Sequence, residues 1–404
     1  MFYRESGDFS TTYPQDSQTF PIKFDRYRYY VILVFAFCVV PFIINDYWLN
    51  AVMLPFLIYA IAAIGLNILT GYCGQVSLGT GGFMAVGAYS CYKFMTGFDL
   101  YFASTGFVSA GGETFPKGGQ MFEVTNQILF FTVAHTEEWM LVMMNPVNVF
   151  FSVILAGLVT SVVGVLFGLP SLRIKGFYLA VATLAAQFFL VWLFNKWEWS
   201  YNYSASGQIN APTRGVLGLE VTGPTASPFA AYLFCLVFVV ACAVVARNLT
   251  RGSVGRKWMA IRDMDIAAEI IGVNPLRAKL TAFAVSSFFV GISGALFFAV
   301  YLGAVEVGEA FGITKSFLVL FMIIIGGLGS IFGSFAGAAF MVLLPVLLKN
   351  ILVGQLGWAT DLAAHIEFMV VGLLIIVFLI MEPHGLAQLW RLAKEKLRLW
   401  PFPY

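Results

Sequence analysis

Two stretches of the chain contain no charged residue, and each is too long to be a single membrane-spanning helix. Between Asp46 and Lys93 lie 46 residues without Asp, Glu, Lys or Arg, and residues 316–348 form a second such run of 33. At about 1.5 Å per residue, one helix over the first run would be roughly 70 Å long, whereas the hydrocarbon core of a bilayer is about 30 Å thick. Each run is therefore predicted to hold two spans separated by a glycine-containing break, at 70–75 and at 326–330.

The same pattern of apolar runs along the whole chain predicts ten membrane-spanning helices. They are expected at 29–48, 51–70, 76–95, 148–170, 177–195, 228–246, 279–303, 314–332, 335–352 and 365–381. An eleventh apolar stretch, 128–144, is interrupted by His135, Glu137 and Glu138 and is interpreted as an external or interfacial element. The predicted fold class is an all-α integral membrane protein with about ten transmembrane helices.

The overall composition agrees with this fold class. Of the 404 residues, 60% are hydrophobic and only 11% are charged, against about 25% in an ordinary soluble domain. A soluble domain of this length is thereby excluded. The net charge of +2 gives no reason to expect a nucleic-acid partner, so membrane lipid is the expected surrounding.

The distribution of the basic residues predicts the orientation. With a cytoplasmic N-terminus and ten spans, 17 of the 23 Lys and Arg residues fall on the cytoplasmic side, as the positive-inside rule requires. Both termini are therefore expected in the cytoplasm of a multi-pass inner (plasma) membrane protein. The predicted organisation is a cytoplasmic extension at 1–28, a transmembrane domain at 29–381 and a cytoplasmic tail at 382–404. Within that domain we expect an external insertion at 98–147 and a cytoplasmic loop at 247–278.

The sequence lacks the residues that several chemical functions require. No charged residue falls in the middle of a predicted span, which argues against a proton-driven transporter. The chain has no P-loop, so it is not expected to be an enzyme, and any ATP hydrolysis would need separate subunits. The three His are scattered and the five Cys show no metal-binding spacing, so no catalytic residue, metal or cofactor is expected. This pattern is typical of a passive channel or of a permease energised by another protein.

The cytoplasmic loop contains a helical segment, 255–272, that ends at Gly272 before an Asn-Pro pair. Its apolar and charged residues separate onto two faces, as in one or two short amphipathic helices. The apolar face is predicted to hold Ile261, Met264, Ala268 and Ile271, and the charged face Arg262, Asp265 and Glu269. Such a helix either rests on lipid headgroups or docks into a groove of another protein.

The loop resembles the cytoplasmic loop of LivM-type permeases of branched-chain amino acid ABC importers. The similarity lies in 262–274 (RDMDIAAEIIGVN) together with Lys279, Leu280 and Phe283. Further motifs of this family follow in the same order along the chain: 71–79 (GYCGQVSLG) with 83–89, then 176–180 (GFYLA) with Thr183, Leu184 and Gln187, then 326–330 (GGLGS) with Gly333 and Gly337. The 98–147 insertion and the 1–28 extension depart from the family pattern.

This resemblance implies a complex. Its expected members are a second, LivH-like permease, two cytoplasmic ATPase subunits and a periplasmic solute-binding protein. It also implies that the loop helix couples ATPase closure to the membrane helices. The coupling residues carried over from the resemblance are Arg262, Asp263, Ala267, Ala268, Glu269 and Gly272.

Polar residues among the glycines of 71–82 are candidates for the substrate pathway. The candidates are Gly74, Gln75, Ser77 and Gly79, joined by Thr183 and Gln187, which share one face of a later span. The glycines are equally consistent with a packing seam between helices, and Thr183 and Gln187 with a hydrogen bond between helices. Glu306 and Glu309, in an external loop, either line the entrance, meet a binding protein, or are ordinary solvated acids.

The function expected from the sequence is that of an ABC importer permease for a small polar solute. Branched-chain or related amino acids are the expected solutes, and related permeases of the family carry urea, short amides and other small organic solutes. The alternative is a passive channel for small neutral solutes such as urea. A channel would conduct alone, whereas a permease would need its ATPase and binding protein.

Overall fold

The computed structural model describes most of the chain. The described residues are 11–12, 23–103, 114–117, 120–128, 131–135, 139–144, 146–171, 178–216, 218–224, 226–381 and 385–399. Most of the predicted 1–28 extension, parts of the 98–147 insertion, and both ends of the 382–404 tail lie outside them. The loop that contains Arg173, Lys175 and Gly176, with Phe177 of the predicted fifth span, also lies outside the described residues.

Each of the ten predicted spans coincides with a helix, and the predicted all-α membrane fold is confirmed. Eight helices in the described ranges are long and apolar enough to cross a membrane: Asp46–Tyr72, Val149–Pro170, Leu179–Lys196, Pro228–Arg251, Pro275–Leu302, Val307–Gly326, Ile331–Gln355 and Thr360–Phe378. The other two predicted spans correspond to shorter helices, Tyr29–Ile43 and a 17-residue helix that begins at Thr80. The predicted 314–332 helix is too long at its end, because the chain leaves the helix after Gly326.

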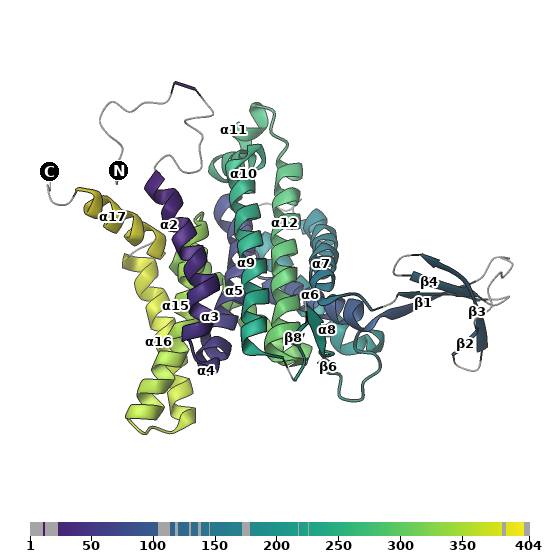
Figure 1. The fold of residues 1–404 in the computed structure, drawn as a ribbon. Helices are drawn as coiled ribbons and strands as arrows, with labels where there is room; N and C mark the ends of the chain where they lie inside the picture. The colour runs from purple at the N-terminus through teal and green to yellow at the C-terminus, as the bar shows by residue number, and fades with distance from the viewer. Residues whose placement is uncertain are drawn as a thin grey trace.

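Several of these spans are built from more than one helical element (Figure 1). The elements in chain order are α2 (Lys23–Val34), η1 (Phe35–Val39), α3 (Val40–Ile43), α4 (Asp46–Trp48), η2 (Leu49–Met53), α5 (Leu54–Asn67), η3 (Ile68–Tyr72), α6 (Thr80–Thr96), α7 (Val149–Ser171), α8 (Tyr178–Lys196), η4 (Glu198–Tyr201), α9 (Pro228–Arg251), α10 (Ser253–Asp263), α11 (Asp265–Ile270), α12 (Pro275–Leu296), η5 (Phe297–Leu302), α13 (Val307–Ala310), α14 (Ile313–Gly326), α15 (Ile331–Lys349), η6 (Asn350–Gln355), α16 (Thr360–Met381) and α17 (Gly385–Leu399). All the η elements except η4 are single π-helical turns that continue a span.

The centre of the bundle is α5, where every residue except Phe56 is buried. Around it, α6 and α12 approach closely because small residues face one another. A Cβ on Gly87 of α6 would overlap the Gly291 carbonyl of α12, and one on Gly294 would overlap the Met84 carbonyl. Close backbone approach at small residues is the usual way in which helices associate in lipid, where apolar burial gives little advantage.

The insertion after α6 contains β-strands, which the sequence pattern did not predict. Its five-stranded antiparallel sheet has the order β1-β5-β4-β3-β2 and projects from the side of the helices (Figure 1). The strands are β1 (Phe98–Ala103), β2 (Thr114–Lys117), β3 (Gln120–Ile128), β4 (Phe131–His135) and β5 (Trp139–Met144). The 128–144 stretch, interpreted as non-spanning, thus forms β4 and β5.

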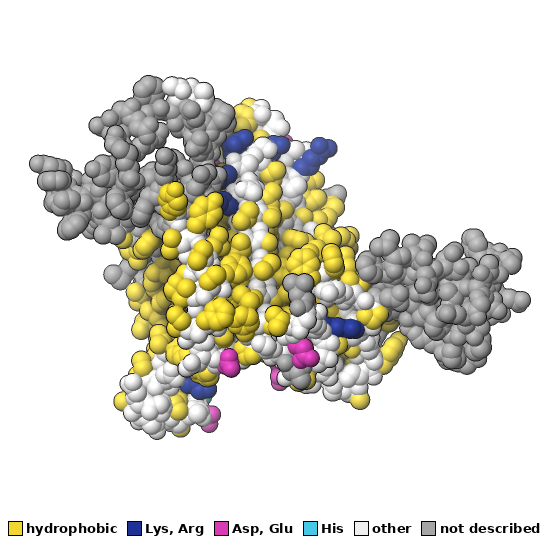
Figure 2. All heavy atoms as spheres, in the orientation of Figure 1, with side chains coloured by type: hydrophobic (Ala, Val, Ile, Leu, Met, Phe, Trp, Pro, Cys, Tyr) yellow, Lys and Arg dark blue, Asp and Glu magenta, His cyan; other side chains and the backbone are white. Residues whose placement is uncertain are grey.

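The two ends of the bundle differ in structure and in charge. One end carries α10, α11 and α17, and the other carries two short antiparallel pairs, β6 (Ile209–Asn210) with β9 (Ala304–Val305) and β7 (Arg214–Val216) with β8 (Leu219–Thr222) (Figure 1). On the face shown in Figure 2, most Lys and Arg side chains gather at the α10–α11 end, and the larger Asp and Glu patches lie at the opposite end.

Candidate functional site

Two glycine breaks meet near the α10–α11 end of the bundle. The first, residues 73–79, separates η3 from α6, and the second, residues 327–330, separates α14 from α15. Gly74, Gly327 and Gly329 have positive φ values of 73°, 114° and 75°, a backbone region that a side chain disfavours. The breaks predicted from the two charge-free runs are therefore present, each held by glycine conformations that other residues rarely adopt.

A single asparagine ties the helical segment before the first break to the second break. Asn67, at the end of α5 and 1% exposed, donates from Nδ2 to the Ser330 carbonyl at 2.9 Å and to Ser334 Oγ at 2.8 Å. Its Oδ1 accepts the Gly329 N–H at 2.8 Å. A Cβ on Gly71 would overlap this Oδ1 and the Gly329 nitrogen, so the glycine at 71 is what allows the contact. Sequence reasoning missed Asn67, whose only signal is a lone amide in an apolar run.

Arg262 brings the motif of the 247–278 loop into contact with both breaks. It lies one residue before the end of α10, and its Nη1 donates to the Gly71 carbonyl at 2.9 Å. A Cβ on Gly74 would lie 3.0 Å from Arg262 Cγ, and one on Gly329 would lie 3.3 Å from Nη1. The guanidinium also pairs with the neighbouring Asp263 at 3.1 Å. Arg262 therefore lies at the point where the loop contacts both breaks.

The loop is also held by contacts of α10 and α11 with α12. Trp258 of α10 is fully buried, and its Nε1 donates to Thr281 Oγ1 at 3.2 Å. Lys279 of α12 pairs with Asp265 of α11 at 2.7 Å. These contacts hold both loop helices against one membrane span.

The predicted faces of the loop helix need correction. The loop forms two helices that meet at Met264, whose extended backbone (φ −157°, ψ 103°) interrupts the helical repeat. Ile261 and Ala268 are buried against the bundle, whereas Met264 and Ile271, predicted for the same face, are exposed. The interruption turns α11 relative to α10, which a continuous 3.6-residue period cannot anticipate.

The remaining predicted coupling residues lie on the surface of the loop. Asp263, Ala267 and Glu269 are exposed, and only Ala268 is buried. Gly272 follows α11 with a positive φ of 89°, and nothing lies within 4 Å of the position of a Cβ there. Asp263, Ala267 and Glu269 are accessible to another protein, and the coupling role of all five residues stays a prediction.

The predicted pathway residues divide into two groups. Gly74 is exposed and Gln75 is half-buried at the first break, whereas Ser77 and Gly79 are buried close to the start of α6. The Gly79 N–H donates weakly to Ser77 Oγ at 3.4 Å, and a Cβ on Gly79 would lie 2.8 Å from the Thr183 carbonyl. The first break is thus open at Gly74 and packed against α8 at Gly79.

Thr183 and Gln187 hydrogen-bond to the backbone of other segments. Thr183 Oγ1 accepts the Leu78 N–H at 2.9 Å. Gln187 Oε1 accepts the Gly82 N–H and, at 3.0 Å, the Ser316 hydroxyl, while its Nε2 donates to the Phe311 carbonyl at 2.7 Å. The two buried side chains thereby join α8 to the start of α6 and to α14. Of the two roles considered for them, interhelical bonding is present, and contact with a solute stays a prediction.

The described residues contain no group of three or more His, Cys, Asp or Glu that could hold a metal ion. All five cysteines are free thiols, and four of them are buried among apolar side chains. The geometry described above consists of hydrogen bonds and packing contacts between helices.

Comparison with known families matches residues 49–379 to the permease component of the branched-chain amino acid transport system. Among characterised proteins, the chain is similar to the high-affinity branched-chain amino acid transport system permease protein LivM of Salmonella typhimurium, with 28% identity over 355 residues, covering 83% of this chain and 69% of that protein. The Escherichia coli protein of the same description is 27% identical over the same extent. A probable LivM of Methanocaldococcus jannaschii is 22% identical, with 84% and 92% covered. No solved structure matches the chain.

Proposed function

Because the chain belongs to the family of permease components of branched-chain amino acid transport systems, we propose that it forms part of the path for a branched-chain or related amino acid in an ABC importer. The protein is a multi-pass inner-membrane protein. The relatives are described as permeases of branched-chain amino acid transport, which supports this choice of solute over urea or an amide. The proposed partners are two ATPase subunits, a second permease and a periplasmic binding protein.

The observation that carries the coupling part of this proposal is the contact between Arg262 and the Gly71 carbonyl. It joins the loop directly to η3, two residues before the first break, and Asn67 continues the connection to the second break. A movement of α10 by a few tenths of an ångström would stretch a 2.9 Å hydrogen bond to the Gly71 carbonyl, which lies in η3 just before the first break. We propose that ATPase closure changes the angle between helices at these breaks, and so alternates access to the path.

The proposed docking surface for an ATPase subunit is the tip of the loop. Four large apolar side chains are exposed there, Met264 at 69%, Ile266 at 74%, Ile270 at 81% and Ile271 at 75%. The tip points away from the bundle at the end where Lys and Arg gather (Figures 1 and 2). The positive-inside rule makes that end cytoplasmic, where ATP is available. The chain itself is proposed to hydrolyse no ATP, since its sequence has no P-loop.

The experiment is ATP-driven leucine uptake by the complete complex reconstituted in liposomes. Ile270→Asp places a charge in the proposed docking surface, and burying a side chain of this size contributes about 1.5–3 kcal/mol. We therefore expect at least about a tenfold loss of ATPase affinity, because about 1.4 kcal/mol corresponds to one factor of ten. The matched control is Leu219→Asp, an exposed apolar residue on β8 at the opposite end.

The outcomes separate the permease from a channel. Uptake that needs ATP and all subunits, falls with Ile270→Asp and survives Leu219→Asp supports the proposal. Uptake by the purified chain alone, without ATP, would show a passive channel. Normal ATPase binding and uptake by Ile270→Asp would show that α11 is not the docking surface.

A further inference from the structure

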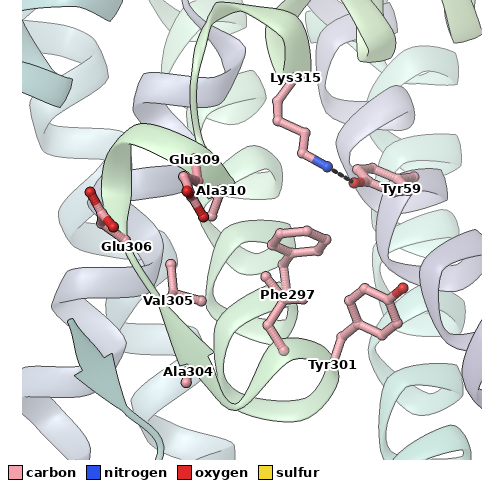
Figure 3. A pocket seen from close by; sticks show the side chains of 10 residues that line it. Tyr59, Phe297, Tyr301, Ala304, Val305, Glu306, Glu309, Ala310 and Lys315 are labelled. Atoms are coloured by element: carbon pink, nitrogen blue, oxygen red, sulfur yellow. Dashed lines mark hydrogen bonds between the residues drawn. The ribbon is translucent and has the colours of Figure 1, made fainter. Parts of the chain in front are cut away.

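A cavity of about 410 Å³ lies at the end of the bundle opposite α10 and α11. Its walls come from α5, η5, β9, α13 and α14 (Figure 3). The volume falls within the roughly 300–1,000 Å³ that small-molecule sites usually have. Leu302, Ala304, Glu306 and Glu309 in its lining are exposed, so the cavity is open to the surroundings at this end.

One wall of the cavity presents a lysine that has no anionic partner within the described part of the chain. Lys315 is half-buried, and its Nζ donates to the Tyr59 hydroxyl at 3.0 Å. The ammonium lies 5.2 Å from the Phe297 ring centre and 5.7 Å from that of Tyr59, within the range of cation–π attraction. Among the described residues, no carboxylate oxygen lies within 4.0 Å of it. A partly desolvated ammonium in this state is stabilised when an anion comes to it.

The facing wall presents two carboxylates. Glu306 precedes α13 and Glu309 lies within it, and Figure 3 shows both on the side of the cavity away from the Lys315–Tyr59 pair. Neither forms an ion pair with a described Lys or Arg. Between the two walls the lining is apolar and aromatic, from Phe297, Tyr301 and Val305.

We infer that this cavity receives an amino acid as its zwitterion. The carboxylate of the amino acid binds at Lys315 and the Tyr59 hydroxyl, and its ammonium group faces Glu306 and Glu309. The aliphatic side chain lies over Phe297 and Tyr301. This inference rests on the proposed function, and it names the substrate class that the outward entrance of the path selects.

The arrangement discriminates by charge rather than by shape. A neutral solute such as urea would leave the Lys315 ammonium without a counterion and the two carboxylates without a cation. A monocarboxylate would satisfy one wall and meet the negative charge of the other. Only a molecule that carries both charges, separated by a short distance, pairs with both walls.

The test measures occupancy of the cavity directly, without relying on the binding protein. Ala304 lines the cavity and is exposed, so Ala304→Cys provides a thiol for a membrane-impermeant methanethiosulfonate reagent. The background variant is Cys38→Ser, because Cys38 is the exposed cysteine and the other four are buried. The rate at which the introduced thiol at position 304 is labelled in the reconstituted complex is measured with millimolar leucine, leucinamide or 4-methylpentanoate. The last two compounds each lack one of the two charges of leucine.

We expect leucine to slow the labelling at least threefold and the two analogues to leave it unchanged. Lys315→Met should abolish the protection, and so should the double variant Glu306→Gln, Glu309→Gln. Lys315→Arg should keep the protection. The matched control is Lys196→Met, an exposed lysine at the same end of the bundle that does not line the cavity. An unchanged labelling rate without ligand shows that a variant has kept the local fold.

Three results would overturn the inference. These are equal protection by all three compounds, protection that survives Lys315→Met, and no protection by leucine in a complex that takes up leucine with ATP. In the last case the proposed function stands and the cavity is not an entrance site. A complex that takes up no leucine at all would instead refute the proposed function, and this inference with it.

Discussion

Replacing Asn67 by Leu, which keeps the branch at Cγ but removes both polar atoms, should loosen the junction between the α5–η3 segment and the second break. Asn67 makes three strong hydrogen bonds, to the Ser330 carbonyl, the Ser334 hydroxyl and the Gly329 N–H. Leu at this position can make none of them. The variant therefore tests whether these bonds hold the second break in the conformation seen here.

The expected free-energy cost of the substitution depends on which hydrogen bonds each partner of Asn67 keeps. The Ser330 carbonyl still accepts the Ser334 N–H at 3.1 Å, and Ser334 Oγ still lies 3.4 Å from that carbonyl. These two partners therefore lose only the bond itself, about 0.6 kcal/mol each in a membrane protein. The half-buried Gly329 N–H loses its side-chain partner, which costs about 1 kcal/mol at the low end of the range. The total is about 2 kcal/mol, or roughly a 30-fold change in the opening equilibrium.

Hydrogen exchange of the reconstituted complex, resolved by mass spectrometry, measures that equilibrium. Amides of 327–333 should exchange roughly 30-fold faster in Asn67→Leu, because exchange of a locally opened segment follows its opening free energy. Amides of α7, which no hydrogen bond of Asn67 reaches, should exchange as before. Asn248→Leu, at an exposed asparagine of α9, is the matched control. Exchange of 327–333 within threefold of the unsubstituted protein would refute the reasoning.

Three further variants test contacts between distant segments. Gly337→Val should lower the thermal stability of the purified protein, because a Cβ there would overlap the Met322 carbonyl; Gly354→Val, where nothing lies within 4 Å, should not. Gln187→Leu should speed hydrogen exchange at 311–316, since the Phe311 carbonyl and the Ser316 hydroxyl each lose a bond, and unchanged exchange there would contradict this. Gly272→Pro should abolish ATP-driven uptake, because proline requires φ near −65° where Gly272 has 89°. Gly272→Ala is strained by about 1–2 kcal/mol and should reduce uptake less. Equal losses of uptake in the two variants would contradict the backbone argument.

The membrane spans could be predicted from the sequence because their length is set by the thickness of the hydrocarbon layer. The run of 46 uncharged residues after Asp46 had to hold two helices whatever their neighbours were. The break between them could be placed at glycines for the same local reason. The sheet of the insertion was not predicted, since strand pairing such as Phe98 with Met144 joins residues far apart in the chain. No local pattern of charge or hydropathy encodes that pairing.

The junction of the candidate site was beyond sequence reasoning for the same reason. Asn67 meets Gly329 across 262 residues, and Arg262 meets Gly71 across 191. The resemblance of the loop implied a coupling role for Arg262, but nothing in the sequence indicated that its partner is the Gly71 carbonyl in η3, just before the first break. Thr183 and Gln187 were recognised as polar residues on one helical face, and only the fold shows which backbone groups they satisfy.

The interruption of the loop helix at Met264 bears on which kind of surface covers the tip of the loop. A continuous helix would have buried Met264 and Ile271 with Ile261, leaving a charged outer face suited to solvent. The interruption at Met264 instead turns Ile266 and Ile270 outward with them. Asp265 and Glu269 lie among these exposed apolar side chains, and carboxylates are disfavoured against an anionic leaflet. An apolar tip carrying acidic residues, held firmly by Trp258 and Lys279 beneath, fits the groove of a protein partner better than it fits lipid or open solvent.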